Sequence, residues 1–108
     1  MNFDEYQKEA VATAIYGAGH SIIYPALGLG NEAGEVQGKV KKVLRDNDGV
    51  FSPEKAQIIG DEIGDVLWYM AALCRDLGIN LDTIAQRNIQ KLRDRQQRGV
   101  IGGSGDNR

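Results

Sequence analysis

A short repeat constrains this chain more than any other feature of its sequence. Residues 30–36 read Gly-Asn-Glu-Ala-Gly-Glu-Val, and residues 60–66 read Gly-Asp-Glu-Ile-Gly-Asp-Val, so each position is identical or chemically similar. Each copy holds two acidic residues three positions apart, a spacing that puts both side chains on one helix face, about 60° apart around the axis. The two acid pairs are Glu32 with Glu35 and Glu62 with Asp65.

Apolar residues recur at helical spacing around both copies, which predicts two amphipathic helices with an acid pair at the edge of each apolar stripe. The short connection between the copies allows the helices to pack antiparallel, and the four carboxylates would then converge at one rim. The predicted stripes are Leu29, Ala33, Val36, Val40 and Leu44 in the first helix, and Ile59, Ile63, Val66, Met70, Leu73 and Leu77 in the second.

Four clustered carboxylates repel one another unless a cation compensates their charge. Oxygen-only ligands suit hard cations, and magnesium is usually held by a few carboxylates together with water and substrate phosphates. One acid pair alone is usually a solvated helix face, but two pairs in the same phase favour a magnesium site, with manganese as a substitute. Gly34 and Gly64, each costly in mid-helix, indicate close backbone approach, with simple tolerance of the glycines as the alternative.

The rest of the chain also carries helix signals, so the predicted fold class is all-α, a bundle of four to five helices. Helices are expected from Asn2 towards Gly17, from Pro25 to the break at 46–49, from Ser52-Pro53 to Gly78, and from Asn80 to Gly99. No convincing strand is found. The predicted organisation is one helical domain over residues 1–99 and a flexible Gly-rich tail over residues 100–108.

Charge, hydropathy and cysteine content limit the binding partners and the cellular compartment to be expected. The net charge of −2 offers no attraction to nucleic-acid backbones, and no apolar run reaches the roughly 18 residues of a membrane span. We therefore expect neither a polymeric nucleic-acid partner nor a membrane. The single cysteine, Cys74, and the lack of a signal-peptide pattern at the start predict the cytoplasm. A chain of 108 residues buries only about two thirds of its unfolded surface and is modestly stable as a monomer, which predicts a homodimer or homotetramer.

Both acid motifs, with their flanking residues, resemble the MazG-like members of the all-alpha nucleoside triphosphate pyrophosphohydrolases. The resemblance lies in residues 27–36 and 61–69 and continues through 78–81 and 88–92. It implies cleavage of a nucleoside triphosphate between the α- and β-phosphates, with a helical catalytic domain completed by oligomerisation. It also implies that the four carboxylates bind catalytic magnesium ions. Glu35 is the preferred general base.

Cationic and polar residues supply candidates for phosphate binding. Lys39 lies one turn beyond Glu35, where a surface lysine in an intrahelical salt bridge is an equally good interpretation. In the last helix, Asn88, Lys91 and Arg95 share a face and resemble the phosphate-binding region of the family. Asn88 falls inside an apolar stripe, where an unpartnered amide would be costly.

Contacts to the base and sugar are less well marked. Near the start of the second helix, the candidates are His20, Ile23, Tyr24 and Leu27. Trp68 and Tyr69 follow the second acid pair directly and offer rings for stacking on a base. Trp68 would otherwise lie in a subunit interface or in the core.

Two other functions use similar sequence features. A carboxylate-bridged di-iron bundle normally needs two Glu-x-x-His motifs, and the only histidine, His20, does not follow a glutamate at that spacing. A non-catalytic helical dimerisation module is the serious alternative, in which the acid pairs are surface features and the apolar stripes drive association.

Overall fold

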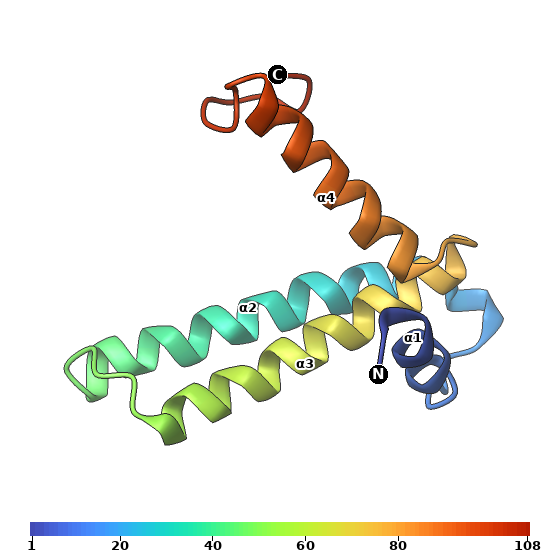
Figure 1. Ribbon diagram of the computed structural model, residues 1–108. Helices are drawn as coiled ribbons and strands as arrows, with labels where there is room; N and C mark the ends of the chain where they lie inside the picture. Colours follow the sequence, from blue (N-terminus) through green and yellow to red (C-terminus); the bar gives the residue numbers. More distant parts are fainter.

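Two helices of equal length form an antiparallel hairpin, and this hairpin carries both copies of the repeat (Figure 1). The computed structural model describes residues 1–108 and contains four α-helices and one short 3₁₀-helix, with no β-strand. The predicted all-α fold class is therefore confirmed. The elements are α1 (Phe3–Val11), η1 (Ala18–His20), α2 (Ile23–Asp46), α3 (Pro53–Asp76) and α4 (Leu81–Gln97).

Local sequence signals set both ends of α3. The Ser52 hydroxyl oxygen accepts a hydrogen bond from the backbone N–H of Lys55, 3.2 Å away, and Pro53 occupies the first helical position. Past the other end, Gly78 has a φ of +73°, a left-handed conformation that favours glycine. Gly99 closes α4 with a φ of +72° in the same way. The predicted boundaries of α3 and the predicted end of α4 are confirmed.

The first helix is shorter than the sequence predicts. Asn2 caps it as expected, because its side-chain oxygen accepts a hydrogen bond from a backbone N–H of the first turn at 2.9 Å. The helix ends at Val11, so the expected run towards Gly17 is wrong. The Thr13 hydroxyl donates to the carbonyl oxygen of Ala10 at 2.7 Å, and such a side-chain bond competes with helix continuation.

The buried side chain of Gln7 joins α1 to the end of α3 and the start of α4. Its amide nitrogen donates to the carbonyl oxygens of Ala71 at 3.2 Å and Ile79 at 3.1 Å. Its amide oxygen accepts from the backbone N–H of Leu81 at 3.0 Å. Asn80 occupies the N-cap position of α4, as predicted, but makes no capping hydrogen bond with its side chain. Gln7 therefore takes the capping role from another helix.

Beyond this junction, α4 projects away from the hairpin (Figure 1). Only eight of the 108 residues are buried, and the core cluster consists of Ala10, Ala71 and Leu81, where α1, α3 and α4 meet. Several large apolar side chains of α4 remain substantially exposed: Ile84, Ile89 and Leu92. The helices do not close into a bundle within one chain, and completion by oligomerisation stays a prediction. None of them combines the length and apolarity needed to cross a bilayer.

Residues 100–108 contain no helix and bend back at the end of α4. The Arg95 guanidinium donates to the carbonyl oxygen of Asp106 at 2.7 Å, and Arg108 donates to the carbonyl oxygen of Gly102 at 2.9 Å. The division into a domain over residues 1–99 and a flexible tail stays a prediction.

Replacing Gln7 by alanine should lower the free energy of unfolding by about 2 to 4 kcal/mol, because it leaves buried backbone groups without partners and opens a cavity. Urea unfolding followed by circular dichroism measures the change. The matched control is Gln37→Ala, at an exposed position of α2, which should change the free energy by less than about 0.5 kcal/mol. Equal, small effects of the two substitutions would contradict the role of Gln7.

Candidate functional site

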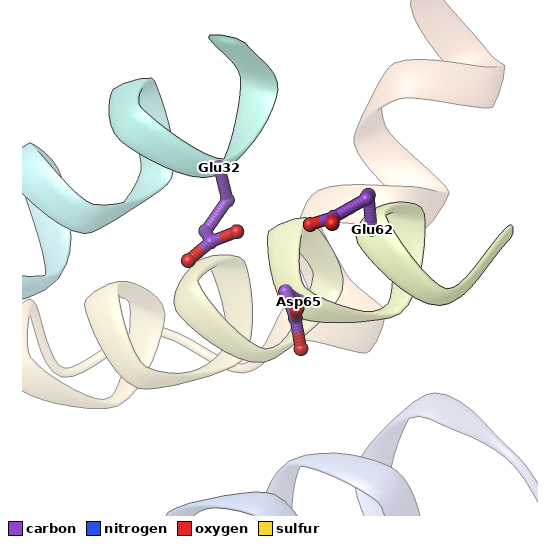
Figure 2. Close-up of side chains that lie close together, drawn as sticks. All are labelled: Glu32, Glu62 and Asp65. Atoms are coloured by element: carbon purple, nitrogen blue, oxygen red, sulfur yellow. The ribbon is translucent and has the colours of Figure 1, made fainter. Parts of the chain in front are cut away.

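Three of the four residues in the two acid pairs come together between α2 and α3. Glu32, Glu62 and Asp65, termed the acid cluster, each offer a carboxylate oxygen, and these oxygens lie within 4.8 Å of one another. Figure 2 shows Glu32 reaching from α2 toward the turns of α3 that carry Glu62 and Asp65. Glu35 follows on α2 and does not belong to this group.

The acid cluster lies closer to the packing seam of the hairpin than the predicted stripes imply. Glu32 and Glu62 are half-buried, and the Glu62 side chain keeps only 19% of its exposure. Leu44 and Ile63, both assigned to the stripes, are instead 62% and 54% exposed, whereas Val43 is 2% exposed. The stripe prediction is wrong at these positions. Both helices are rotated about their own axes relative to the orientation that the stripes predict. As a result, Glu32 and Glu62 lie closer to the interface between α2 and α3.

Crowding of like charges changes the acidity of Glu32. Partial burial, followed by the negative charges of the other two cluster members and of Glu35, raises the pKa of Glu32 above its ordinary value. A hydrogen bond with the Glu62 side chain acts in the same direction. Lys39 offsets part of this repulsion, because its Nζ lies 4.0 Å from Glu62 Oε1. A bound cation would relieve the remainder.

The donor atoms of the acid cluster suit a hard divalent cation. All three are carboxylate oxygens, and neither His20 nor Cys74 belongs to the group. Such oxygen ligands favour magnesium or manganese. Two oxygens that share one octahedral magnesium ion lie about 3 to 4 Å apart, so small side-chain rotations would bring the cluster oxygens into one coordination sphere. The residues therefore fit the predicted metal.

An aromatic pocket of about 400 Å³ adjoins the acid cluster. Tyr24, Trp68 and Tyr69, three of the residues expected to contact base or sugar, line this pocket. Glu32 and Asp65 also line it, so the pocket and the acid cluster share a wall. Its volume falls within the range of small-molecule sites.

One wall of the aromatic pocket comes from a segment that the sequence reasoning missed, namely Thr13, Ile15 and Tyr16. The Tyr16 ring stacks on Tyr24 with ring centroids 4.8 Å apart. The Trp68 ring N–H donates to the Thr13 hydroxyl oxygen at 2.9 Å, across 55 residues of sequence. No local pattern marks this segment, because its place at the site depends largely on contacts with α3 that are distant in sequence.

Asp76 holds the same segment against the end of α3. Its carboxylate accepts hydrogen bonds from the Tyr16 hydroxyl at 2.8 Å and from the backbone N–H of Ile22 at 3.0 Å. Burial acts to raise the pKa of Asp76, but these bonds and one from Arg75 outweigh it and lower the pKa. The bond to Ile22 supports a φ of +69°, a left-handed conformation rare for a branched residue.

The other predicted site residues lie outside the acid cluster and the aromatic pocket. Three of them are exposed near the start of α2 and do not line the pocket: His20, Ile23 and Leu27. Asn88 and Lys91 are exposed on α4, which projects away from the hairpin (Figure 1). Asn88 is therefore not the buried amide that the stripe suggested. Arg95 is buried and bound to the carbonyl oxygen of Asp106.

Tyr69 packs so closely over α2 that a Cβ atom at Gly28 would collide with its ring. A Cβ at Gly34 or Gly64 would meet nothing within 4 Å, so the close approach predicted at those two glycines is wrong. Hydrogen bonding to Tyr24, burial and nearby negative charges raise the pKa of Tyr69 to about 12. The Tyr69 hydroxyl thus stays protonated at neutral pH beside the acid cluster.

Comparison with protein-family models matches residues 24–100 to the MazG nucleotide pyrophosphohydrolase domain. The chain belongs to this family. The MazG match includes all four residues of the two acid pairs, whereas α1 and the segment Thr13–Tyr16 precede it. This MazG-family protein is also 50% identical to the Gene 37 protein of Mycobacterium phage L5 over 114 aligned residues, with both chains covered completely. No solved structure matches it.

Two glycine substitutions test how this MazG-family protein packs its aromatic pocket. Gly28→Ala should lower the free energy of unfolding by roughly 1 to 3 kcal/mol, because the added methyl group must displace the Tyr69 ring. Gly34→Ala should instead raise it by up to about 1 kcal/mol, because alanine favours the helix and meets open space. Thermal unfolding measures both values. Stabilisation by Gly28→Ala would show that Tyr69 does not pack against α2.

In the metal-free MazG-family protein, Glu62→Gln should lower the pKa of Glu32, because it removes one neighbouring negative charge. The pKa should stay partly raised, since burial is its largest cause. Carbon-13 NMR titration of the side-chain carboxyl measures the shift. The matched control is Asp61→Asn, an exposed neighbour outside the acid cluster, which should leave the Glu32 pKa nearly unchanged.

The sign of the linked stability change follows from the raised pKa. A carboxyl group with a raised folded-state pKa stabilises the fold below its unfolded-state pKa, and that contribution disappears as the pH rises through the folded-state value. The metal-free protein should therefore lose the Glu32 contribution on going from acidic to neutral pH, and Glu62→Gln should reduce the loss. A Glu32 pKa that ignores the charge at position 62 would contradict the proximity of the two groups.

Proposed function

We propose that this protein is a magnesium-dependent pyrophosphohydrolase of ribo- or deoxyribonucleoside triphosphates. It would cleave between the α- and β-phosphates and release the nucleoside monophosphate and pyrophosphate. The observation that carries this proposal is the convergence of three carboxylates at the wall of an aromatic pocket. Membership of the MazG nucleotide pyrophosphohydrolase family supports the reaction class.

The residues divide into a metal-binding and a base-binding group. Bound magnesium would supply positive charge at the phosphoryl oxygens and a more acidic water molecule. The acid cluster would hold the metal, and Glu35 would complete the ligand set or act as general base. The rings of Tyr24 and Tyr69 would contact the nucleobase, with the α-phosphate placed at the shared wall.

The proposed reaction is a hydrolysis in which one bond forms and one breaks. Glu35 takes a proton from water while the water oxygen bonds to the α-phosphorus. The bond from that phosphorus to the bridging oxygen breaks, and the oxygen leaves with its electron pair as part of pyrophosphate. Glu35 then releases its proton to the solvent or to a product phosphate, which restores the carboxylate for the next turnover.

Phosphate contacts come from two directions in this proposal. Lys39 lies beside the acid cluster of its own chain, 4.0 Å from Glu62. Asn88 and Lys91 are exposed on α4, which leaves the hairpin, so we propose that they serve a partner subunit in a homodimer or homotetramer (Figure 1). Arg95 would first have to leave the carbonyl oxygen of Asp106 to join them. The exposed apolar residues of α4 favour such an association.

The competing function is a non-catalytic helical dimerisation module. Exposed apolar side chains on α4 would serve that function equally well. It gives no reason, however, for half-buried like charges at the packing seam beside an open aromatic pocket. It predicts neither pyrophosphate release nor any effect of divalent metal on stability.

With magnesium and a panel of nucleoside triphosphates, the protein should release pyrophosphate and nucleoside monophosphate, as identified by phosphorus-31 NMR. Asp65→Asn should lower kcat by at least about 100-fold, because it removes one carboxylate from the acid cluster while helix content stays intact. Asp61→Asn is the matched control, because Asp61 lies outside the cluster, and should retain activity.

Magnesium or manganese should also raise the melting temperature of the wild-type protein more than that of Asp65→Asn, because a ligand that binds only the folded state stabilises it. Orthophosphate as the first product would reject the assigned cleavage. The absence of both pyrophosphate release and a metal-dependent shift would favour the dimerisation module.

A further inference from the structure

A second pocket, of about 320 Å³, opens between the C-terminal half of α2 and the N-terminal half of α3. Three lysines line it from both helices, and we term it the lysine pocket: Lys39, Lys42 and Lys55. Asp46 and Asn47 line it near the turn between the helices. Sequence reasoning singled out only Lys39, because Lys42 and Lys55 lie on different helices and share no motif.

The lysine pocket carries a net positive charge that the protein does not neutralise. Asp46 is its one acidic lining residue, and Arg45 already binds both carboxylate oxygens of Asp46, at 2.8 and 2.9 Å. Neither Lys42 nor Lys55 forms an ion pair within 4.0 Å. The ammonium groups of Lys42 and Lys55 therefore remain available to an anion with several negative charges, and Lys39 adds a third that it shares with Glu62 at 4.0 Å.

The lysine pocket continues directly from the acid cluster. Lys39 lines the pocket, and its Nζ lies 4.0 Å from Oε1 of Glu62 in the cluster. The aromatic pocket adjoins the cluster through Glu32 and Asp65, near the opposite end of the hairpin. Along α2, Lys39 follows Glu32 by about 10 Å at the usual helical rise, which a lysine side chain can largely span.

We propose that the lysine pocket binds the β- and γ-phosphates of the triphosphate and holds pyrophosphate as it leaves. This inference rests on the proposed function and gives the substrate a direction along the hairpin. The base lies in the aromatic pocket, the α-phosphate beside the acid cluster, and the two outer phosphates among the three lysines. Ammonium groups there neutralise the charge that the bridging oxygen gains when its bond to the α-phosphorus breaks.

The test is the double substitution Lys42→Met with Lys55→Met, which keeps most of each aliphatic stem and removes both charges. KM for the triphosphate and the inhibition constant for pyrophosphate should each rise roughly tenfold or more, the loss expected for charge-assisted hydrogen bonds. The inhibition constant for the nucleoside monophosphate, which does not reach the lysine pocket, should stay unchanged. Lys41→Met, at an exposed position of α2 outside the pocket, is the matched control.

A second measurement keeps this inference separate from the proposed function. Inorganic pyrophosphate added to the full chain in excess chelator should shift the amide NMR signals of Asn47 and Lys55 in the wild type, with much smaller shifts in the double variant. If the wild type releases no pyrophosphate from any nucleotide, the proposed function fails, and with it the substrate assignment of the pocket. If turnover is present but the double variant leaves KM and pyrophosphate inhibition unchanged, the lysine pocket is not the subsite. If the double variant binds free pyrophosphate more weakly but keeps the wild-type KM, the assignment of the lysine pocket to the β- and γ-phosphates is also overturned.

Discussion

Repulsion among three carboxylates at the packing seam of the α2–α3 hairpin is the constraint on which the rest of this structure depends. Glu32 and Glu62 are half-buried there, and partial burial together with the neighbouring negative charges raises the pKa of Glu32. Such an arrangement opposes the packing that creates it, so the hairpin must be stabilised elsewhere. In this chain the stabilising contacts lie at the far end of α3, where Gln7 and Asp76 bind segments before α2 and at the start of α4.

The same seam orders the surface of the hairpin into three chemically different zones. Aromatic rings gather near the start of α2 and the end of α3, carboxylates occupy the middle, and lysines line the end near the turn. A nucleoside triphosphate has matching parts in the same order, with a flat base, a reacting α-phosphate and two outer phosphates. The antiparallel direction of the helices makes this order possible, because each helix contributes residues to every zone.

Sequence predicts those parts of the molecule that depend on local signals. Ser52, Pro53 and Gly78 fix the ends of α3 through capping and backbone preference, and the repeat places Glu32 opposite Glu62. The rotation of the helices was not predictable in detail, because glycines and charged residues leave the apolar stripes discontinuous. The Thr13–Tyr16 wall and the contact of Tyr69 with α2 were missed because both depend on pairing between residues distant in sequence.

The position of α4 affects both the small core of one chain and the phosphate contacts proposed for this helix. With eight buried residues, one chain leaves many large apolar side chains exposed, and those of α4 include Ile84, Ile89 and Leu92. The same helix carries Asn88 and Lys91, both exposed, and it projects away from the hairpin that holds the acid cluster (Figure 1). If α4 packed against the hairpin of a second subunit, its apolar side chains would be buried. The same packing would hold the polar residues of α4 in place beside that hairpin. Association and phosphate binding would then be coupled, so the stability of the oligomer would depend on the bound nucleotide.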